Sequence, residues 1–413
     1  MTEQDQGPDG DRLTTREAAE RLGVKPETVY AYVSRGQLGS RRDPGGRGST
    51  FDAEEVEALV RRGRRQTAAG GDGTPAIRTG ITLIDTDRYY FRGVDATELA
   101  RRYHYEEIAD WLWTGTLERG IRFTAPPEPL AAARRAVEAL PAHSGSTDRL
   151  RVAAIAAAAA DPLRFDLGPS AVTGVGRTLV PTLVDALPVV GTALRGEERL
   201  AGRLWSRLTA RQPDETSLRA LDMALSLLID HDLAASTLAA RVAASARAHP
   251  YAVVSAGLGA LDGPLHGAAS GLAHRMLAEV LERGSAAPVV ADHLRAGRRV
   301  PGLGHRLYPA RDPRAEALFD ALSEIPDARP ALAAAREVEA TAARQTDLHA
   351  NVDLALATLS VSAGMAAEAG ETVFAVARTA GWIAHALEEY AERPLRMRPS
   401  GRYSGPRPPR PVP

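Results

Sequence analysis

Hydrophobic residues recur at helical spacing over most of this chain, and alternating β-branched runs are scarce. From residue 77 onward, alanine- and leucine-rich segments separated by glycine and proline predict one helix after another. The clearest such segments are Ala96–Leu117, Arg149–Ala160, Ser217–Ile229, Ala234–Ala248 and Glu371–Tyr390. Only Gly80–Tyr90 has the pattern of a small β-hairpin. We therefore expect a mainly all-α fold.

The elements predicted in the first 65 residues are shorter than those of the helical body. Thr14 is placed to cap a helix over Thr15–Leu22, which ends at a glycine, and Pro26 opens a second helix through Val33. The stretch SRRDPGGRGSTF is typical of a Gly-rich β-hairpin wing, and a third helix is expected over Asp52–Arg62. This order predicts a small winged helix-turn-helix domain.

The composition changes along the chain mark the domain boundaries. We assign 11–65 to the helix-turn-helix domain and 66–75, which is rich in small residues and glycine, to a flexible linker. The helical body then spans 76–405. The remaining residues, 406–413, form a Pro-rich tail that we expect to be disordered.

The overall composition is ordinary for a globular protein, with 44% hydrophobic and 25% charged residues among 413. The N-terminus is polar and acidic and lacks the apolar stretch of a secretory signal. The apolar runs are too short to span a bilayer. We therefore expect a cytoplasmic protein without a membrane partner.

The residue types that are absent or rare exclude several kinds of catalytic and metal site. Cysteine is absent, which excludes disulfides, thiolate metal sites and a thiol nucleophile. Lys25 is the only lysine, so no Schiff-base or P-loop lysine exists beyond the first thirty residues. No HExxH motif occurs, and His266 and His274 are eight positions apart, so no metal site is expected. Acid–base chemistry must come from His, Asp, Glu or Tyr.

Three polar positions stand out in the second half. His266 lies in GPLHGAASG, His305 follows the Gly-rich turn of VPGLGHRLYPARDPRAEAL, and Asp353 lies in ANVDLALATL at the expected start of a helix. Taken singly, each has a structural explanation. A histidine near a turn is often a surface or core residue whose hydrogen bonds are satisfied, and Asp353 can cap a helix.

Taken in order, these segments resemble the citrate synthase family. GPLHG, PGxGHRxYxxxDPRA, NVD, FAVARTAGWIAH and RPxxxY follow the family's sequence of motifs, and GITLIDTDRYYFRGVDATELA and HDLAASTLAARVAAS resemble its N-terminal opening and substrate-histidine helix. The resemblance covers about residues 76–405. It implies a helical fold of a large and a small subdomain that close over the substrates, and a homodimer.

The resemblance also implies an acyltransferase. Acetyl-CoA or propionyl-CoA would condense with oxaloacetate or a related 2-oxo acid, with CoA as co-substrate and no permanently bound cofactor. Such a Claisen-type condensation needs a base, a hydrogen-bond donor to the enol and a donor to the acceptor carbonyl. By resemblance these are Asp353, His266 and His305. The resemblance also implies that Arg314, Arg378 and Arg398 bind the substrate carboxylates, with Arg398 coming from the partner chain. His231 would hold the oxo acid. Gly302 and Gly304 would let the backbone approach the CoA thioester.

The sequence departs from the family pattern at four positions. Ala268 and Ser270 stand where the family usually has Gly and Asn, Ala234 replaces an Asn, and Leu354 replaces an aromatic residue. These changes leave every proposed acid, base and carboxylate-binding arginine in place. We expect them to affect the choice of acceptor rather than the class of reaction.

The N-terminal stretch LTTREAAERLGVKPETVYAYVSRGQL resembles the helix-turn-helix of MerR-like and excisionase-like proteins. In such folds the second helix enters the DNA major groove. The DNA-binding residues would be Lys25, Thr28, Tyr30, Arg35, Arg41 and Arg42. Residues 1–66 carry twelve basic and twelve acidic side chains, however, so the module is neutral. An accessory domain for protein contacts or dimerisation is the alternative interpretation.

Two functions therefore stay open. The first is an active synthase. The second is a DNA-binding transcription regulator whose synthase-like body senses CoA or an oxo acid, which would explain the fused helix-turn-helix.

Overall fold

The computed structural model describes residues 12–22, 24, 26–34, 38–42, 48–57, 59, 77–192, 199–263, 266–267, 269–308, 310–344, 347–399 and 404–405. The chain divides into two compact units, residues 1–78 and residues 79–413. The predicted linker at 66–75 and tail at 406–413 lie outside the described residues. Within the described part, no helix is long and apolar enough to cross a membrane.

The first unit contains the predicted helices and wing. Its elements are β1 (Arg12–Thr14), α1 (Thr15–Leu22), α2 (Pro26–Ser34), β2 (Ser40–Arg42) and β3 (Ser49–Asp52), followed by helical residues 53–57. Thr14 and Glu17 cap α1 reciprocally, because the Glu17 carboxylate accepts from the Thr14 amide and the Thr14 hydroxyl accepts from the Glu17 amide. The wing is a three-stranded antiparallel sheet in the order β1-β3-β2, because β1, which we did not predict, pairs with β3.

The second unit is almost entirely helical, as predicted. A small antiparallel sheet opens it, formed by β4 (Thr82–Asp85), β5 (Arg88–Phe91) and β6 (Val94–Asp95). The helices that follow are α4 (Ala96–Arg102), α5 (Tyr105–Thr114), α6 (Pro127–Glu138), α7 (Ser146–Ala159), α8 (Pro169–Ala186), α9 (Leu200–Leu208), α10 (Glu215–Leu227), α11 (Ala235–Ser245), α12 (Pro250–Leu261), α13 (Ala269–Arg283), α14 (Ala286–Arg295), α15 (Pro313–Ser323), the 3-10 helix η1 (Pro326–Ala328), α16 (Arg329–Ala342), α17 (Val352–Ser362) and α18 (Ala369–Ala391).

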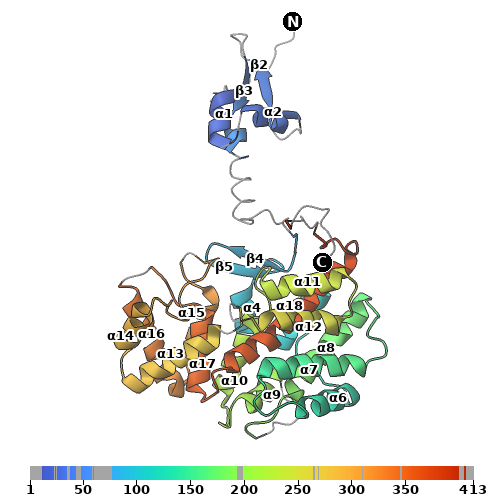
Figure 1. Ribbon diagram of the computed structural model, residues 1–413, viewed down its shortest axis with the longest axis vertical. Helices are drawn as coiled ribbons and strands as arrows, with labels where there is room; N and C mark the ends of the chain where they lie inside the picture. The colour runs from blue at the N-terminus through green and yellow to red at the C-terminus, as the bar shows by residue number, and fades with distance from the viewer. Residues whose placement is uncertain are drawn as a thin grey trace, which may run out of the picture. The chain divides into compact units, whose positions relative to one another are not determined.

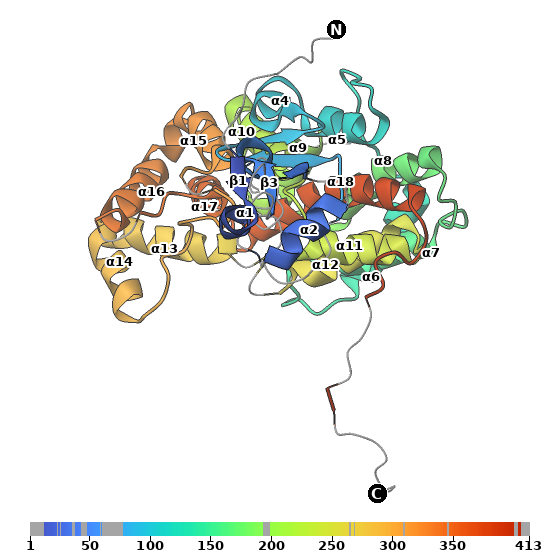
Figure 2. The same ribbon diagram turned by 90° about the horizontal axis from the view of Figure 1, so that it is seen from above.

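These helices form two groups within the second unit. Helices α13 to α17 gather on one side, while α6 to α12 form the larger group together with the long α18 (Figures 1 and 2). The arrangement agrees with the expected large and small subdomains. One hydrophobic core runs through both groups.

One predicted helix is interrupted. The segment Ala96–Leu117 divides into α4 and α5, with a break at Tyr103 and His104. The His104 amide donates to Glu107 in a capping box, and its ring nitrogen Nδ1 lies 2.8 Å from a carboxylate oxygen of Asp222 on α10. A new helix N-terminus therefore forms here because a distant acidic residue holds the break in place.

The long helix α18 is packed tightly against the segment that leads into the functional site. Trp382 is fully buried within it. A Cβ at Gly381 would lie 2.1 Å from the carbonyl oxygen of Ile229, so only glycine permits this approach. One turn earlier, the Nε of Arg378 donates to the carbonyl of Leu228 at 2.9 Å. These contacts fix the backbone just before His231.

Candidate active site

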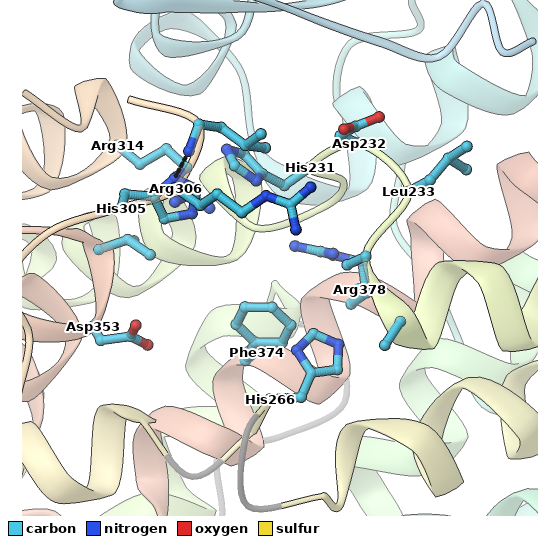
Figure 3. Close-up of a pocket in the computed structure, with 14 residues that line it drawn as sticks. His231, Asp232, Leu233, His266, His305, Arg306, Arg314, Asp353, Phe374 and Arg378 are labelled. Atoms are coloured by element: carbon cyan, nitrogen blue, oxygen red, sulfur yellow. Dashed lines mark hydrogen bonds between the residues drawn. The ribbon is translucent and has the colours of Figure 1, made fainter. Parts of the chain in front are cut away.

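A cavity of about 360 Å³ is lined by both helix groups. Six of the residues singled out from the sequence lie around it: His231, His266, His305, Arg314, Asp353 and Arg378. His231 and His305 lie on the opposite side of the cavity from His266 and Phe374 (Figure 3). Segments more than 120 residues apart in the chain thus place these polar groups around one space.

Asp353 lies in the first turn of α17. Asn351, not Asp353, caps this helix, because its side-chain oxygen accepts from the amides of Asp353 and Leu354. The Asp353 carboxylate forms no hydrogen bond or ion pair with other described residues, and it is directed at the cavity. Burial raises the pKa of Asp353 to about 6; the Arg314 charge opposes this rise and the Asp312 charge adds to it.

His305 is held as a neutral imidazole of known tautomer. Its Nδ1 accepts from the backbone N–H of Leu307 at 3.1 Å, so the ring proton must be on Nε2. Burial lowers the pKa of His305 to about 4, with the nearby Arg314 charge acting in the same direction. The ring therefore offers a neutral N–H donor near pH 7.

His266 lies in the turn before α13. Its Nε2 is 2.8 Å from the hydroxyl of Ser236, which is fully buried in the first turn of α11. Its ring meets Phe374 edge to face, with centroids 6.0 Å apart. Burial lowers the pKa of His266, and the Arg378 charge lowers it further. His266 is thus a second neutral imidazole facing the cavity.

His231 lies on the segment between α10 and α11. Its Nε2 is 2.8 Å from the hydroxyl of Tyr308, and its ring centroid is 5.1 Å from that of His305. Burial lowers the pKa of His231 well below its ordinary value, and the charges of Arg314 and Arg378 contribute. All three cavity histidines are therefore kept neutral by desolvation and neighbouring cations.

Arg314 is oriented by a carboxylate two residues earlier in the chain. Asp312 binds it through two hydrogen bonds, of 2.9 Å to Nε and 2.7 Å to Nη2, and both side chains are buried. Asp312 also accepts from the amide of Val352, the first residue of α17. The pair therefore connects the arginine to the helix that carries Asp353, and it leaves Nη1 of Arg314 for a ligand.

Arg378 is the second buried arginine of the cavity. Its guanidinium lies 4.6 Å from the centre of the Phe374 ring, and its Nη1 has no hydrogen-bond partner among the described residues. Burial lowers the pKa of Arg378 to about 10, opposed by the buried Asp230 carboxylate, so the group stays cationic near pH 7. An unpaired buried guanidinium is costly unless an anion binds it.

The N-terminus of α11 adds to the positive potential. Ala234 occupies the N-cap position and lines the cavity, and its methyl group cannot accept a hydrogen bond from the helix amides. The partial positive charge of these amides favours an anion in the cavity. The Ala234 departure thus changes both the helix cap and the lining of the cavity.

Three other predicted site residues do not line the cavity. Arg398 lies beyond α18, where its amide donates to Leu395. Gly302 and Gly304 have φ of +78°, and a Cβ on Gly302 would lie 2.7 Å from the Cβ of Leu354. These glycines join the His305 loop to the start of α17, because Asn351 bonds to both of their carbonyls. Their approach to a CoA thioester stays a prediction.

The sequence reasoning missed three residues that hold the predicted ones in place: Asp312, Tyr308 and Ser236. Asp312 and Tyr308 lie inside the same quoted motif as His305 and Arg314. An acidic residue two positions before a candidate arginine could have suggested the ion pair. No pattern in the sequence indicates that Tyr308 reaches His231 or that Ser236 reaches His266.

The first unit carries its own predicted positions. Thr28, Tyr30 and Arg41 are exposed, with Tyr30 47% exposed on α2. Lys25, Arg35 and the side chain of Arg42 lie outside the described residues. Across the described part of the whole chain, no group of three His, Cys, Asp or Glu residues is arranged to hold a metal ion.

Comparison with known proteins identifies the family. A family model for the citrate synthase C-terminal domain matches residues 70–400, and a helix-turn-helix domain model matches residues 12–64. The citrate synthase of Haloferax volcanii is 31% identical over 363 residues, covering 81% of this chain and 95% of that protein. A putative citrate synthase 2 of Mycobacterium bovis is 33% identical, covering 82% and 93%. The chain belongs to the citrate synthase family and carries an N-terminal helix-turn-helix domain.

Solved structures agree with this assignment. The citrate synthase of Thermotoga maritima is 27% identical with a TM-score of 0.65, covering 83% of this chain and 97% of that one. The Thermoplasma acidophilum citrate synthase, solved in a ternary complex with carboxymethyl coenzyme A and oxaloacetate, is 24% identical with a TM-score of 0.67 over 83% and 97% of the two chains. The latter likeness is evidence for the shared fold alone.

Proposed function

We propose that this protein condenses acetyl-CoA with oxaloacetate, or with a related 2-oxo acid, to give citrate or a homologue and free CoA. One observation carries the proposal: a single cavity brings together a carboxylate with raised pKa, three neutral histidines and two buried arginines. The match to the citrate synthase family and the 31% identical citrate synthase of Haloferax volcanii support the same class of reaction.

The geometry supports the following steps. The ionised Asp353 takes a proton from the acetyl methyl group, and its raised pKa brings its proton affinity closer to that of the carbon acid. His266 donates a hydrogen bond to the enol oxygen as it forms, in a role that a neutral imidazole can perform. Ser236 can donate to Nε2 of His266, which places the ring proton on Nδ1 for this purpose.

The enol carbon then attacks the keto carbon of the acceptor and forms the new carbon–carbon bond. The Nε2–H of His305 hydrogen-bonds to the keto oxygen and stabilises the alkoxide that forms there. The alkoxide takes up one proton while Asp353 releases the one that it removed from the methyl group. Arg314 and Arg378 bind the acceptor carboxylates, for which their free Nη1 groups are suited. Hydrolysis of the resulting thioester by water releases CoA and completes the reaction.

We infer further that a homodimer completes the site, with Arg398 supplied by the partner chain. Exposed apolar side chains support an interface on the large group of helices: Ile155 on α7 is 60% exposed and Val242 on α11 is 47% exposed. Such side chains favour burial against a second copy. The Val242→Asp variant should sediment as a monomer and lose turnover, whereas an active monomer would contradict the shared site.

A thiol-release assay tests the reaction directly. Purified protein is given acetyl-CoA or propionyl-CoA with each of a panel of 2-oxo acids, and the Asp353→Asn variant serves as the inactive control. We expect release with oxaloacetate or a close analogue that depends on Asp353. No release with any pair of substrates would reject the synthase proposal.

A second candidate function, transcription regulation, is favoured by the helix-turn-helix match and by the exposed Thr28, Tyr30 and Arg41. Two modules on one dimer would fit a palindromic site with half-sites about one helical turn apart. A gel-shift titration with and without oxaloacetate and CoA separates the two functions. Because we expect an independent module, the affinity should change by less than about tenfold, or 1.4 kcal/mol. A larger change without turnover would favour a sensor.

A further inference from the structure

Tyr308 is a buried tyrosine next to the cavity that the reaction steps above do not use. It is 2% exposed and does not line the cavity itself. Its hydroxyl lies 2.8 Å from Nε2 of His231. Its ring packs against His305, with centroids 5.1 Å apart, and lies 5.7 Å from the guanidinium carbon of Arg314. The phenol thus has one hydrogen-bond partner among the described residues, and that partner is a cavity histidine.

The direction of this hydrogen bond decides which nitrogen of His231 carries the proton. Burial raises the pKa of Tyr308 and lowers that of His231, so both groups are neutral near pH 7. If His231 donated, the hydroxyl hydrogen of Tyr308 would have no acceptor among the residues described, and a buried unsatisfied donor is costly. If Tyr308 donates, its hydroxyl hydrogen is paired with Nε2 of His231, and the His231 proton is on Nδ1.

The remaining nitrogen of His231 is the one that can meet a ligand. His231 lines the cavity, and its Nδ1 makes no hydrogen bond within the described part of the chain. An Nδ1–H there is complementary to a carboxylate or keto oxygen. A bare Nδ1 lone pair would repel the same oxygen. The tautomer of His231 therefore determines whether it helps or opposes binding of an oxo acid.

We propose that Tyr308 is a positioning residue that donates its hydroxyl hydrogen to Nε2 of His231 and so directs the Nδ1–H of His231 to the oxo-acid substrate. This inference rests on the proposed function for its substrate. Tyr308 then affects the affinity for the oxo acid, but neither the affinity for the acyl-CoA nor the proton transfers at Asp353.

The Tyr308→Phe variant tests the proposal because it keeps the ring and its contacts and removes only the donor. We expect the KM for oxaloacetate to rise about tenfold, while kcat stays within about twofold and the KM for acetyl-CoA does not change. A loss of kcat at unchanged KM for oxaloacetate would overturn the proposal.

Tyr89→Phe is a matched control. Tyr89 is also buried, and its ring centroid is 6.0 Å from that of His231, but its hydroxyl donates to the carbonyl of Leu227 instead. Like Tyr308→Phe, this variant removes a phenol oxygen near His231, but that oxygen does not bond to the imidazole. We expect its KM for oxaloacetate to match wild type. Equal increases in both variants would mean a general packing effect and would overturn the role of Tyr308.

A spectroscopic measurement tests the tautomer without turnover. In full-length protein labelled with ¹⁵N-histidine, the His231 resonances are assigned by their loss in His231→Gln. We expect the Nδ1–H tautomer in wild type and a shift towards Nε2–H in Tyr308→Phe. An Nε2–H tautomer in wild type refutes the proposal. If wild-type protein shows no thiol release, the proposed function fails, and the ¹⁵N spectrum still decides the role of Tyr308.

Discussion

Replacing Asp353 with asparagine removes the ionisable group at the start of α17 with little change in side-chain shape. The carboxylate has no hydrogen-bond or ion-pair partner among the described residues, so the substitution breaks no described side-chain contact. Its backbone amide still donates to Asn351. We expect the variant to fold, to lose nearly all turnover and to become more stable than wild type.

The size of the gain follows from the pKa. Burial raises the pKa of Asp353 from its ordinary 3.8 to about 6, so the folded state disfavours the ionised form. Each pKa unit corresponds to about 1.4 kcal/mol, which gives about 3 kcal/mol as an upper value. The side chain is only half-buried, and solvent screening reduces this figure, so we expect about 1–3 kcal/mol.

The gain must also depend on pH. Between about pH 4 and pH 6 the folded chain holds a proton on Asp353 that the unfolded chain has released. The destabilisation of wild type therefore grows as the pH rises through this window, is complete above about pH 6 and vanishes below about pH 4. Asp353→Asn should have a higher free energy of unfolding than wild type at pH 8, and the same free energy of unfolding below about pH 4.

Denaturant unfolding at several pH values, at fixed protein concentration, measures this difference. Thiol release measured in parallel should fall by on the order of 10²–10⁴-fold. Asp347→Asn is the control, because Asp347 is exposed and should leave stability and turnover unchanged. Equal stability of wild type and Asp353→Asn at pH 8, or a gain that does not vary with pH, would refute the account of a buried, unpaired base.

Four further predictions concern the same site and the N-terminal module. The kcat/KM for the oxo acid should rise with pH through about 6 as Asp353 ionises, and a wild-type pH–rate profile that is flat between pH 5 and 7 would assign the base elsewhere. Arg378→Leu should weaken oxo-acid binding by roughly 3–5 kcal/mol in binding free energy, measured by calorimetry. An effect on acyl-CoA binding alone would place Arg378 in a different subsite. Arg314→Leu should do the same and also lower the Tm, because the buried Asp312 loses its bidentate partner. A chain lacking residues 1–70 should keep wild-type thiol release, and loss of activity on truncation would show that the body depends on the module.

Much of the fold could be predicted from the sequence, because helix positions depend on patterns within a few residues, and the candidate site residues came from the resemblance of their motifs to the citrate synthase family. Helical spacing and Gly/Pro breaks placed most helices, and Thr14 and Glu17 specify their own capping box three residues apart. Likewise Asp353 lies at a helix start because Asn351 just before it is a strong N-cap. The residue types that a condensation needs are also visible in the motifs themselves.

Only the tertiary structure decided how those residues are held and charged. The break before α5 depends on Asp222, more than 100 residues away, and the hydroxyl bound to His231 comes from Tyr308 on a distant loop. The raised pKa of Asp353 and the lowered pKa of His305 arise mainly from the burial of these groups in the folded chain. Desolvation and long-range hydrogen bonds depend on which segments meet in space, and no spacing along the chain encodes that directly.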